Sequence, residues 1–410
     1  MTAAQAAGKG VAFDPFEPGF VDSPYEQYAR LRDADPVHWS GMLQGWVLTR
    51  HDDVASLLRD PTVSSDLDNA SPTTVVSRQR ERQARGGRRS DTLVLRDDPD
   101  HDRLRKLLQR PFGPRPVEGL RRMVSARVDA AIAELAPQGA MDVIADFAYP
   151  LPVAVFCEQL GLPDEDTPRV REWIRAVARM LDPVLADDEY DRCNQLMNEL
   201  YGYLEGQVEA KRRAPANDVL TQLVHAEDDG DTLTRDELVA QLVTLYVAGH
   251  EPTTALVGNG LLALLRQPEQ LELLRARPDL LPNAVHELLR FDGPNQFVRR
   301  IAVAPITFGT VRIAPGDVIY LGIGAANRDP DRWTDPDRVR VDREDAARHL
   351  QFGAGIHMCL GSHLARLQAE VMLGALVHRL DDVALAGEPV WSDRMVLRGL
   401  RHLPIAYRAA

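Results

Sequence analysis

The residues with the greatest chemical potential lie in one short segment, 352–361, which reads Phe-Gly-Ala-Gly-Ile-His-Met-Cys-Leu-Gly. Its single cysteine, Cys359, lies among Gly353, Gly355 and Gly361, just before a predicted helix. Glycines permit a tight turn and let backbone N–H groups approach a sulfur closely. Such donors, together with a helix N-terminus, favour a thiolate and lower the thiol pKa. A thiolate held in this way can act as a nucleophile or as a haem iron ligand. An inert core cysteine would need neither the glycines nor Phe352.

A second candidate is a pair of cations, His101 and Arg105. Their spacing of four residues puts both side chains on one face of a predicted helix, where they can bind two anionic oxygens. Solvated surface charges are the ordinary explanation when such a pair stands alone.

A third candidate is Glu287 with Arg290, three residues apart on a predicted helix. The spacing alone is weak, because surface pairing on helices has the same period. It recurs at Glu118/Arg121, Glu172/Arg175, Glu209/Arg212 and Glu272/Arg275. Glu287 stands apart by position, since it precedes a region of short strands and lies upstream of the cysteine segment.

The fourth candidate is the segment 248–254, Ala-Gly-His-Glu-Pro-Thr-Thr, in the middle of a long predicted helix. Pro252 has no N–H and clashes with the carbonyl four residues back, that of Ala248, so we expect a local distortion there. The hydroxyl of Thr253 lies about 100° further around the helix axis than position 252.

Together these motifs resemble the cytochrome P450 superfamily. Segment 352–361 matches its FGxGxHxCLG haem-binding signature at every fixed position. The resemblance implies haem b as cofactor, with Cys359 as the axial thiolate ligand of the iron and Phe352, Gly353 and Gly361 shaping the loop. It implies that His101, Arg105, His357 and Arg300 hold the haem propionates. Arg299 is the neighbour with which Arg300 is most easily confused.

The resemblance also assigns the other two candidates. Glu287 and Arg290 would form a buried bidentate pair that locks the meander at 327–336 behind the haem. The family shows an acid and an alcohol side by side in the central helix, as a proton relay. This chain keeps Ala248, Gly249 and the acid Glu251, but Pro252 stands where the alcohol belongs and Thr253 is one position late.

The predicted elements are mainly helices with a few short strands. We expect helices at 24–34, 51–58 and 364–380, and strands at 45–49, 306–309 and 317–320. From 100 to 265 the pattern is almost continuous helix, interrupted at 111, 161–163, 214–215 and 228–231. Its longest helix, 233–265, opens on Thr234 with Glu237 in a capping-box spacing and is apolar nearly all round, which predicts a central buried helix.

These elements predict one mainly α domain spanning 1–410, with a flexible N-terminus over 1–20. By the resemblance, the fold is the helical triangular prism with small β-sheets. Residues 60–98 read as a long loop, and its arginine run, Arg78, Arg80, Arg82, Arg85, Arg88 and Arg89, is more typical of a solvated surface than of a binding patch.

Composition excludes several classes of protein. The 410 residues carry a net charge of −13, which argues against nucleic acid as partner. No apolar run approaches the ~18 to 20 residues that a membrane span requires, and the first ten residues lack a secretory signal. Three cysteines cannot build a disulfide framework. We therefore expect a cytoplasmic protein, acting as a monomer.

The resemblance implies O2- and NAD(P)H-dependent hydroxylation or epoxidation of a medium-sized natural product in secondary metabolism. Since the chain has no flavin or iron–sulfur motif, electrons would come from a ferredoxin and a ferredoxin reductase. The ferredoxin would dock on Arg103, Lys106, Arg110 and Arg366. The first alternative is oxidative C–C or C–O coupling of aromatic rings in a peptide or cyclic dipeptide. The remote alternative is a non-catalytic haem sensor or recruitment protein. The retained acid Glu251 argues against it.

The substrate pocket implied by the resemblance is mostly apolar, which suits a largely uncharged compound. Its expected lining comprises the 60–98 loop, Met180, Leu181, Leu245, Ala248, Asn295, Gln296, Phe297, Val298, Met395 and Val396.

Overall fold

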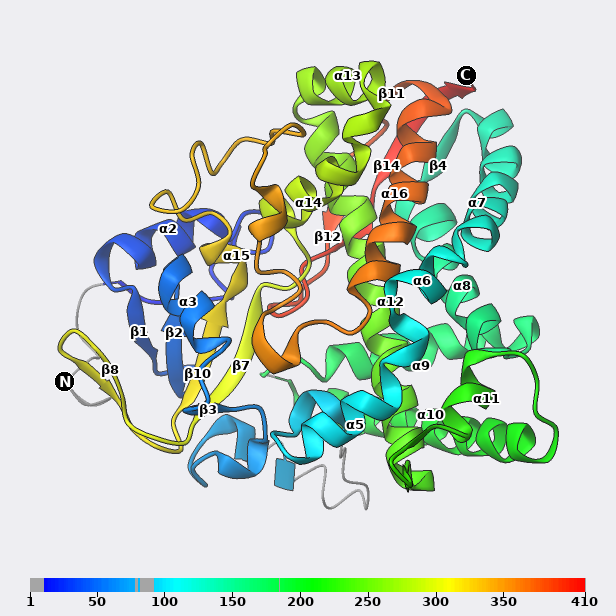
Figure 1. Ribbon diagram of the computed structural model, residues 1–410. Helices are drawn as coiled ribbons and strands as arrows, with labels where there is room; N and C mark the ends of the chain where they lie inside the picture. The colour runs from blue at the N-terminus through cyan, green and yellow to red at the C-terminus, as the bar shows by residue number, and fades with distance from the viewer. Residues whose placement is uncertain (1–10, 78–79, 82–91, 184, 410) are drawn as a thin grey trace.

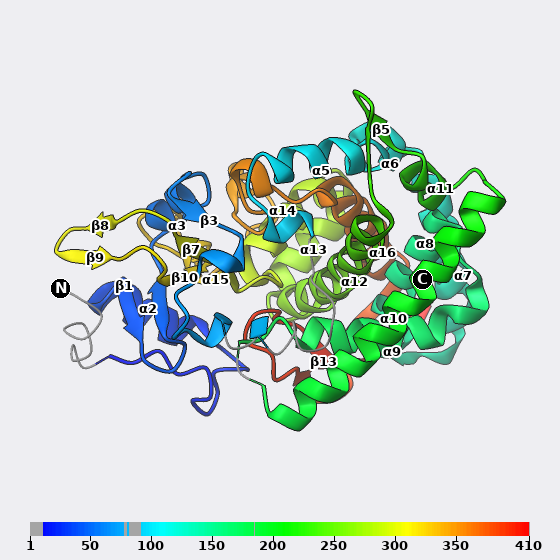
Figure 2. The same ribbon diagram turned by 90° about the horizontal axis from the view of Figure 1, so that it is seen from below.

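The computed structural model describes residues 11–77, 80–81, 92–183 and 185–409. A sheet-rich part and a larger helical part lie side by side (Figures 1 and 2). The sheet-rich part holds a five-stranded sheet in the order β1 (Val37–Ser40), β2 (Gly45–Leu48), β10 (Val318–Gly322), β7 (Phe297–Ala302) and β3 (Val63–Ser64). β10 pairs with β2 in parallel, and the other neighbours are antiparallel.

The remaining strands form smaller sheets. One has three strands, in the order β11 (Leu380–Leu385), β14 (Pro404–Ala409) and β4 (Ala140–Asp142). Three others are antiparallel pairs: β5 (Glu227–Asp228) with β6 (Asp231–Thr232), β8 (Ile306–Phe308) with β9 (Val311–Ile313), and β12 (Val390–Trp391) with β13 (Leu400–His402).

Three helices pack around the five-stranded sheet: α2 (Tyr25–Ala34), α3 (His51–Leu57) and α15 (Ile323–Ala326) (Figure 1). The others form the helical part: α5 (Asp100–Leu108), α6 (Pro114–Glu118), α7 (Arg121–Leu135), α8 (Pro150–Leu160), α9 (Thr167–Arg179), α10 (Asp187–Arg213), α11 (Val219–Val224), α12 (Arg235–Leu265), α13 (Pro268–Ala276), α14 (Leu281–Asp292) and α16 (Ser362–His378).

Helix α12 is the central element of the helical part (Figure 2). Its predicted capping box is present, because Thr234 and Glu237 bond each other's backbone N–H groups. Its 31 residues extend about 46 Å at 1.5 Å per residue. The first half, up to Tyr246, belongs to one hydrophobic core with α8 and α10, and the second half, from Leu256, to another with α7, α14 and α16. The middle of α12 therefore lies between two cores.

Local sequence patterns predicted most elements, and the differences have long-range causes. The expected helix over 100–265 is also interrupted at 136–149, by β4 and a π-helical turn over Val143–Ala148. β4 pairs with β14, which lies at the other end of the chain, so no local pattern could indicate it. Of the arginine run at 78–89 in this loop, Arg80 forms ion pairs with Asp66 and Asp68. Arg78, Arg82, Arg85, Arg88 and Arg89 lie outside the described residues.

One further expectation was wrong. Residues 11–20 do not form a flexible terminus, because Phe13 packs edge-on against Phe297 and Phe20 against Tyr28 in a buried cluster.

Among the described residues, one stretch, Val143–Leu160, is long and apolar enough by composition to cross a membrane. It is 72% buried inside the protein, which is typical of a core helix.

Candidate functional site

The Cys359 loop makes the tight turn that its glycines predict. Gly353 (φ +68°) and Gly355 (φ +70°) adopt the left-handed conformation that other residues rarely take. A Cβ atom on Gly355 would lie 2.7 Å from the carbonyl oxygen of Leu58, so this glycine also permits two segments to approach closely. The N–H of Cys359 donates to the carbonyl of Phe352 at 2.8 Å and closes the loop in front of α16.

Cys359 keeps accessible surface, although the protein around it desolvates its thiol. Burial raises the pKa of its thiol, and a backbone hydrogen bond from Gly361 and the charge of Arg105 only partly oppose this. The direction is opposite to the lowered pKa that the sequence predicted, because desolvation of the anion outweighs these donors. A bound metal cation would reverse the balance, since it deprotonates a coordinating thiol.

The middle of α12 carries an accessible stripe between two stretches of mostly buried residues. Ala248 is exposed, and Thr244, Leu245, Gly249, Glu251 and Pro252 are partly exposed. Positions 244, 248 and 252 are successive i, i+4 neighbours and so share one face. Because α16 packs along α12 and Cys359 lies just before α16, the stripe and the sulfur belong to neighbouring elements.

Two histidines from distant segments meet beside the cysteine loop. The rings of His101, in α5, and His357 are 4.5 Å apart and edge-to-face. The Nε2 atoms of both are buried and have no hydrogen-bond partner among the described residues. The pKa of each ring is lowered chiefly by burial, that of His357 to about 3. A buried polar atom without a partner costs about 1–3 kcal/mol, so the pair is suited to a ligand with oxygen acceptors.

Two arginines complete this cluster. Arg105 Nη1 donates to the carbonyls of Ile356 and Met358, at 3.0 and 2.9 Å, and thus joins α5 to the cysteine loop. Arg300 is buried in β7, its pKa lowered to about 10 by burial, and its charge acts on His357. Two histidines and two arginines around unsatisfied ring nitrogens fit a group with two carboxylates, as in haem. The sequence analysis named all four, but it did not foresee the bonds of Arg105 to the loop carbonyls.

Arg299 is distinguished from Arg300 by its surroundings. Neighbouring residues of a strand point to opposite faces of the sheet. Arg299 pairs in register with Tyr320, whose ring opposes the lowering of the Arg299 pKa by burial. The charge on Arg300 instead acts on His357. Arg300 therefore stays the predicted propionate ligand.

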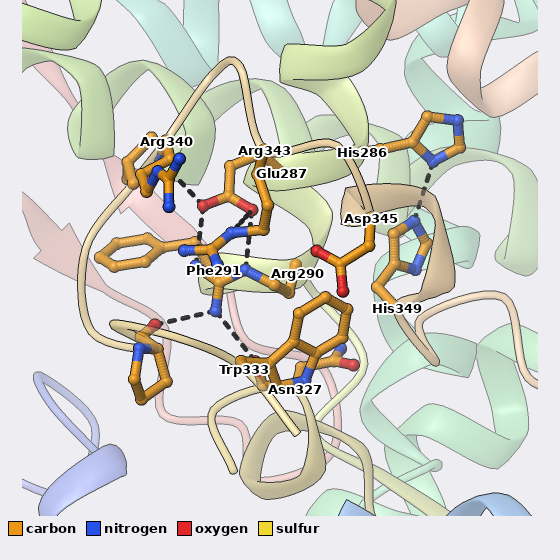
Figure 3. Close-up of polar contacts among 12 residues, drawn as sticks. His286, Glu287, Arg290, Phe291, Asn327, Trp333, Arg340, Arg343, Asp345 and His349 are labelled. Carbon is orange, nitrogen blue, oxygen red and sulfur yellow. Dashed lines mark hydrogen bonds and ion pairs between the residues drawn. The ribbon is translucent and has the colours of Figure 1, made fainter. Parts of the chain in front are cut away.

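Glu287 and Arg290 form the buried bidentate pair (Figure 3), with both side chains at 0% exposure. Arg290 Nε and Nη2 donate to the two carboxylate oxygens at 2.7 and 2.8 Å. Arg290 also donates to the carbonyls of Asn327 and Pro336, so it holds the predicted meander. Arg343, which the sequence analysis missed, donates to Glu287 at 2.9 Å. Two cations thus share one buried carboxylate.

The acid of the central helix has a partner that the sequence did not indicate. Glu251 Oε2 accepts a hydrogen bond of 2.8 Å from Arg394 Nη1, while its Oε1 is buried without a partner among the described residues.

Thr253 is buried, and its hydroxyl donates to the carbonyl of Gly249 at 3.3 Å, back onto its own helix. α12 continues through Pro252 as α-helix, so the expected distortion does not interrupt it. His250 is also buried, its pKa lowered to about 4 by burial, and is stacked on Tyr246.

Several residues expected to line a substrate pocket are elsewhere. Gln296 is buried and bonds Tyr28 and the carbonyl of Gly293, and Phe297 packs on Phe13. Met395 is buried in the same cluster as Phe297. The prediction was wrong for these three, because contacts with the N-terminal segment and α2 hold their side chains in the core.

The other expected lining residues keep some accessible surface. Leu181 is exposed, and Met180, Leu245, Asn295, Val298 and Val396 are partly exposed. Asn295 Nδ2 donates to the carbonyl of Gln351 at 3.2 Å, next to the cysteine loop.

Comparison with known proteins gives consistent matches over almost the whole chain. A family model described as Cytochrome P450 matches residues 57–388. The cytochrome P450 monooxygenase PikC of Streptomyces venezuelae is 39% identical over 399 residues, 95% of this chain and 92% of that protein. The vitamin D(3) 25-hydroxylase of Pseudonocardia autotrophica is 38% identical over 399 residues, 96% of each chain.

Solved structures agree with the sequence matches. The structure of epothilone D-bound cytochrome P450epoK superposes with a TM-score of 0.89 at 30% identity, covering 97% of this chain and 99% of that one. At this identity and coverage the likeness extends to the whole fold.

Proposed function

This chain belongs to the cytochrome P450 family and is a monooxygenase, and we propose that it hydroxylates or epoxidises a medium-sized natural product of secondary metabolism. Haem bound through a cysteine thiolate supplies O2 activation, because the thiolate donates electron density that favours O–O cleavage. The remaining work of the site is done by the chain's own residues.

The observation that carries the proposal is an accessible Cys359 beside two buried imidazoles whose Nε2 atoms lack partners. In the proposal, Cys359 is the axial ligand of haem b. His101 and His357 donate to the propionates, with Arg105 and Arg300 supplying the positive charge. The hydrogen bonds from Arg105 to the carbonyls of Ile356 and Met358 hold α5 against the loop that carries Cys359.

The proposed substrate is largely apolar. The accessible stripe of α12 offers Leu245 and Ala248, and Leu181, Val298 and Val396 add apolar surface. Relatives named for vitamin D(3) hydroxylation and for binding epothilone D support a compound of this size.

A direct test begins with the absorbance of the reduced protein under CO, which reports a thiolate ligand. A library of natural products is then titrated for a low- to high-spin shift, and hits are incubated with NAD(P)H, a surrogate ferredoxin and its reductase. Oxygenated product detected by mass spectrometry supports the proposal. Spin shifts without any product, with reductant still consumed by a control enzyme, would favour a sensor.

Ring coupling is kept as a second candidate because Pro252 occupies the alcohol position. We expect Pro252→Thr to restore the acid–alcohol pair and to leave product formed per NAD(P)H unchanged or improved. A fall in that ratio would mean that the proline itself shapes the reaction and would favour coupling.

Glu251→Gln should slow turnover roughly ten- to a hundredfold or more, because positioned proton transfer contributes about 10²- to 10⁴-fold. Turnover is measured as product formed and peroxide released. Full activity in this variant would show that protons arrive by another route, with Thr253 the first candidate.

The proposed electron donor is a ferredoxin that approaches the cysteine-loop side from the cytoplasm. Arg103 is bound to Glu237 and Asp231, and Lys106 to Asp102, which leaves less free charge than the sequence suggested. Arg110 has no ion pair among the described residues. We expect Lys106→Glu with Arg110→Glu to slow ferredoxin-dependent haem reduction and to weaken its salt dependence.

The matched control for this docking face is Arg266→Glu. Arg266 is exposed and caps the opposite end of α12, about 44 Å along the helix axis from Glu237, the partner of Arg103. Equal reduction rates for the docking variant, the control and the wild type across ionic strength would exclude this face.

A further inference from the structure

The acid on the accessible stripe of α12 is tied to a segment of the far C-terminal region. Glu251 pairs through Oε2 with Arg394, and each side chain is only 15% exposed. Arg394 lies between β12 and β13, next to Met395 and Val396. A partly buried ion pair fixes a carboxylate more firmly than a solvated one, because screening is weaker there.

The segment that carries Arg394 is itself held by a buried acid. Asp182, in the connection between α9 and α10, is 3% exposed. Its Oδ1 accepts hydrogen bonds from the backbone N–H groups of Met395, at 3.2 Å, and Val396, at 3.0 Å. Arg179 Nη1 donates to its other oxygen, at 2.5 Å. Through Asp182, the α9–α10 connection therefore fixes the backbone of residues 395–396, which follow Arg394 directly.

In this set of contacts, Glu251 Oε1 is the atom that can transfer a proton. Oε1 is buried and has no partner among the described residues, although a carboxylate oxygen in such a place normally has one. With Oε2 held by Arg394, Oε1 is the atom through which a proton can be taken from water and passed on. Taking up one proton from solvent gives the carboxylic acid, and delivering that proton restores the carboxylate for the next one.

We propose that Arg394 is a positioning residue for Glu251, and that Asp182 sets Arg394 through the backbone at 395–396. This inference rests on the proposed function and deepens it. A substrate that moves the α9–α10 connection or the 394–396 segment changes the orientation of the acid, so occupancy of the pocket and proton delivery are coupled.

The first experiment compares Arg394→Gln, Arg394→Lys and Arg401→Gln in the haem-loaded enzyme. Arg401 is the matched control, because it forms an exposed ion pair with Asp393 in the same region. Arg394→Gln should lower product per NAD(P)H at least about threefold and change the solvent isotope effect on kcat, with KM within about twofold. Arg394→Lys should recover most of the loss, and Arg401→Gln should match the wild type.

The second experiment tests the link to Asp182. Asp182→Ala removes the acceptor for both backbone N–H groups, whereas Asp182→Asn retains an acceptor oxygen. We expect Asp182→Ala to reproduce the loss of coupling seen in Arg394→Gln and Asp182→Asn to cause a smaller loss. The double variant Asp182→Ala/Arg394→Gln should lose less than the product of the two single effects, because both act on one element.

The outcomes separate this inference from the proposed function. Every variant is first checked for the ferrous-CO band, and absence of that band in the wild type would overturn the proposed function itself. An impaired Glu251→Gln beside a wild-type-like Arg394→Gln would overturn only the positioning role. A rise in KM alone would instead make Arg394 a substrate contact. If Arg394→Gln fails to fold, Arg394→Lys and Asp182→Ala decide: equal coupling in both and in the wild type refutes the proposal.

Discussion

Cys359→Ser is expected to abolish the thiolate signature and turnover. A neutral serine hydroxyl cannot donate charge to an iron as a sulfur anion does. The ferrous-CO complex of this variant should therefore absorb far from the wild-type band, and product formation should fall below detection. Absorbance after reduction under CO measures the first effect, and product analysis with the surrogate ferredoxin measures the second.

The control for this experiment is Cys193→Ser, since Cys193 is buried in α10 and far from the loop in sequence. Its CO band should equal that of the wild type. An unchanged band in Cys359→Ser, or a band lost equally in both variants, would remove the ligand role from Cys359.

Glu287→Gln should produce the largest loss of stability. The substitution leaves Arg290 and Arg343 in the interior with no carboxylate between them. Leaving a buried charge without its partner costs about 3–5 kcal/mol. We therefore expect a much lower denaturation midpoint and a smaller haem-loaded fraction, because the meander carbonyls that Arg290 bonds would lose their anchor. Denaturant unfolding and the ratio of haem to protein absorbance measure both effects.

Glu272→Gln is the matched control, because Glu272 and Arg275 have the same i, i+3 spacing on a surface helix, at 2.9 Å. Exposed pairs of this kind contribute about 0–1 kcal/mol. Equal loss of stability in the two variants would show that burial of Glu287 is not what matters.

The pairs Glu287/Arg290 and Glu272/Arg275 show what can and cannot be predicted from spacing in the sequence. Both have identical spacing, and only position along the chain favoured Glu287 over its four rivals. The spacing says that two side chains share a helix face, whereas burial depends on what packs against that face. The structure buries one pair completely and leaves the other exposed.

The features that the sequence determined are those with a local cause. The Cys359 loop was recognisable because the left-handed turns at Gly353 and Gly355 require glycine at those positions. The start of α12 was recognisable because Thr234 and Glu237 bond within one turn. Such contacts depend on neighbours in the chain, so their residue types and spacing are visible without a fold.

Only the tertiary structure decided the contacts between distant segments. Arg343 reaches Glu287 across 56 residues, Arg394 reaches Glu251 across 143, and Val396 reaches Asp182 across 214. Folding brings together segments that the local pattern treats as independent, and the energy of each pair depends on burial that no spacing encodes. For the same reason Gln296 and Phe297 belong to the core rather than to the pocket, because the packing of their strand against α2 and the N-terminal segment decides which way they face.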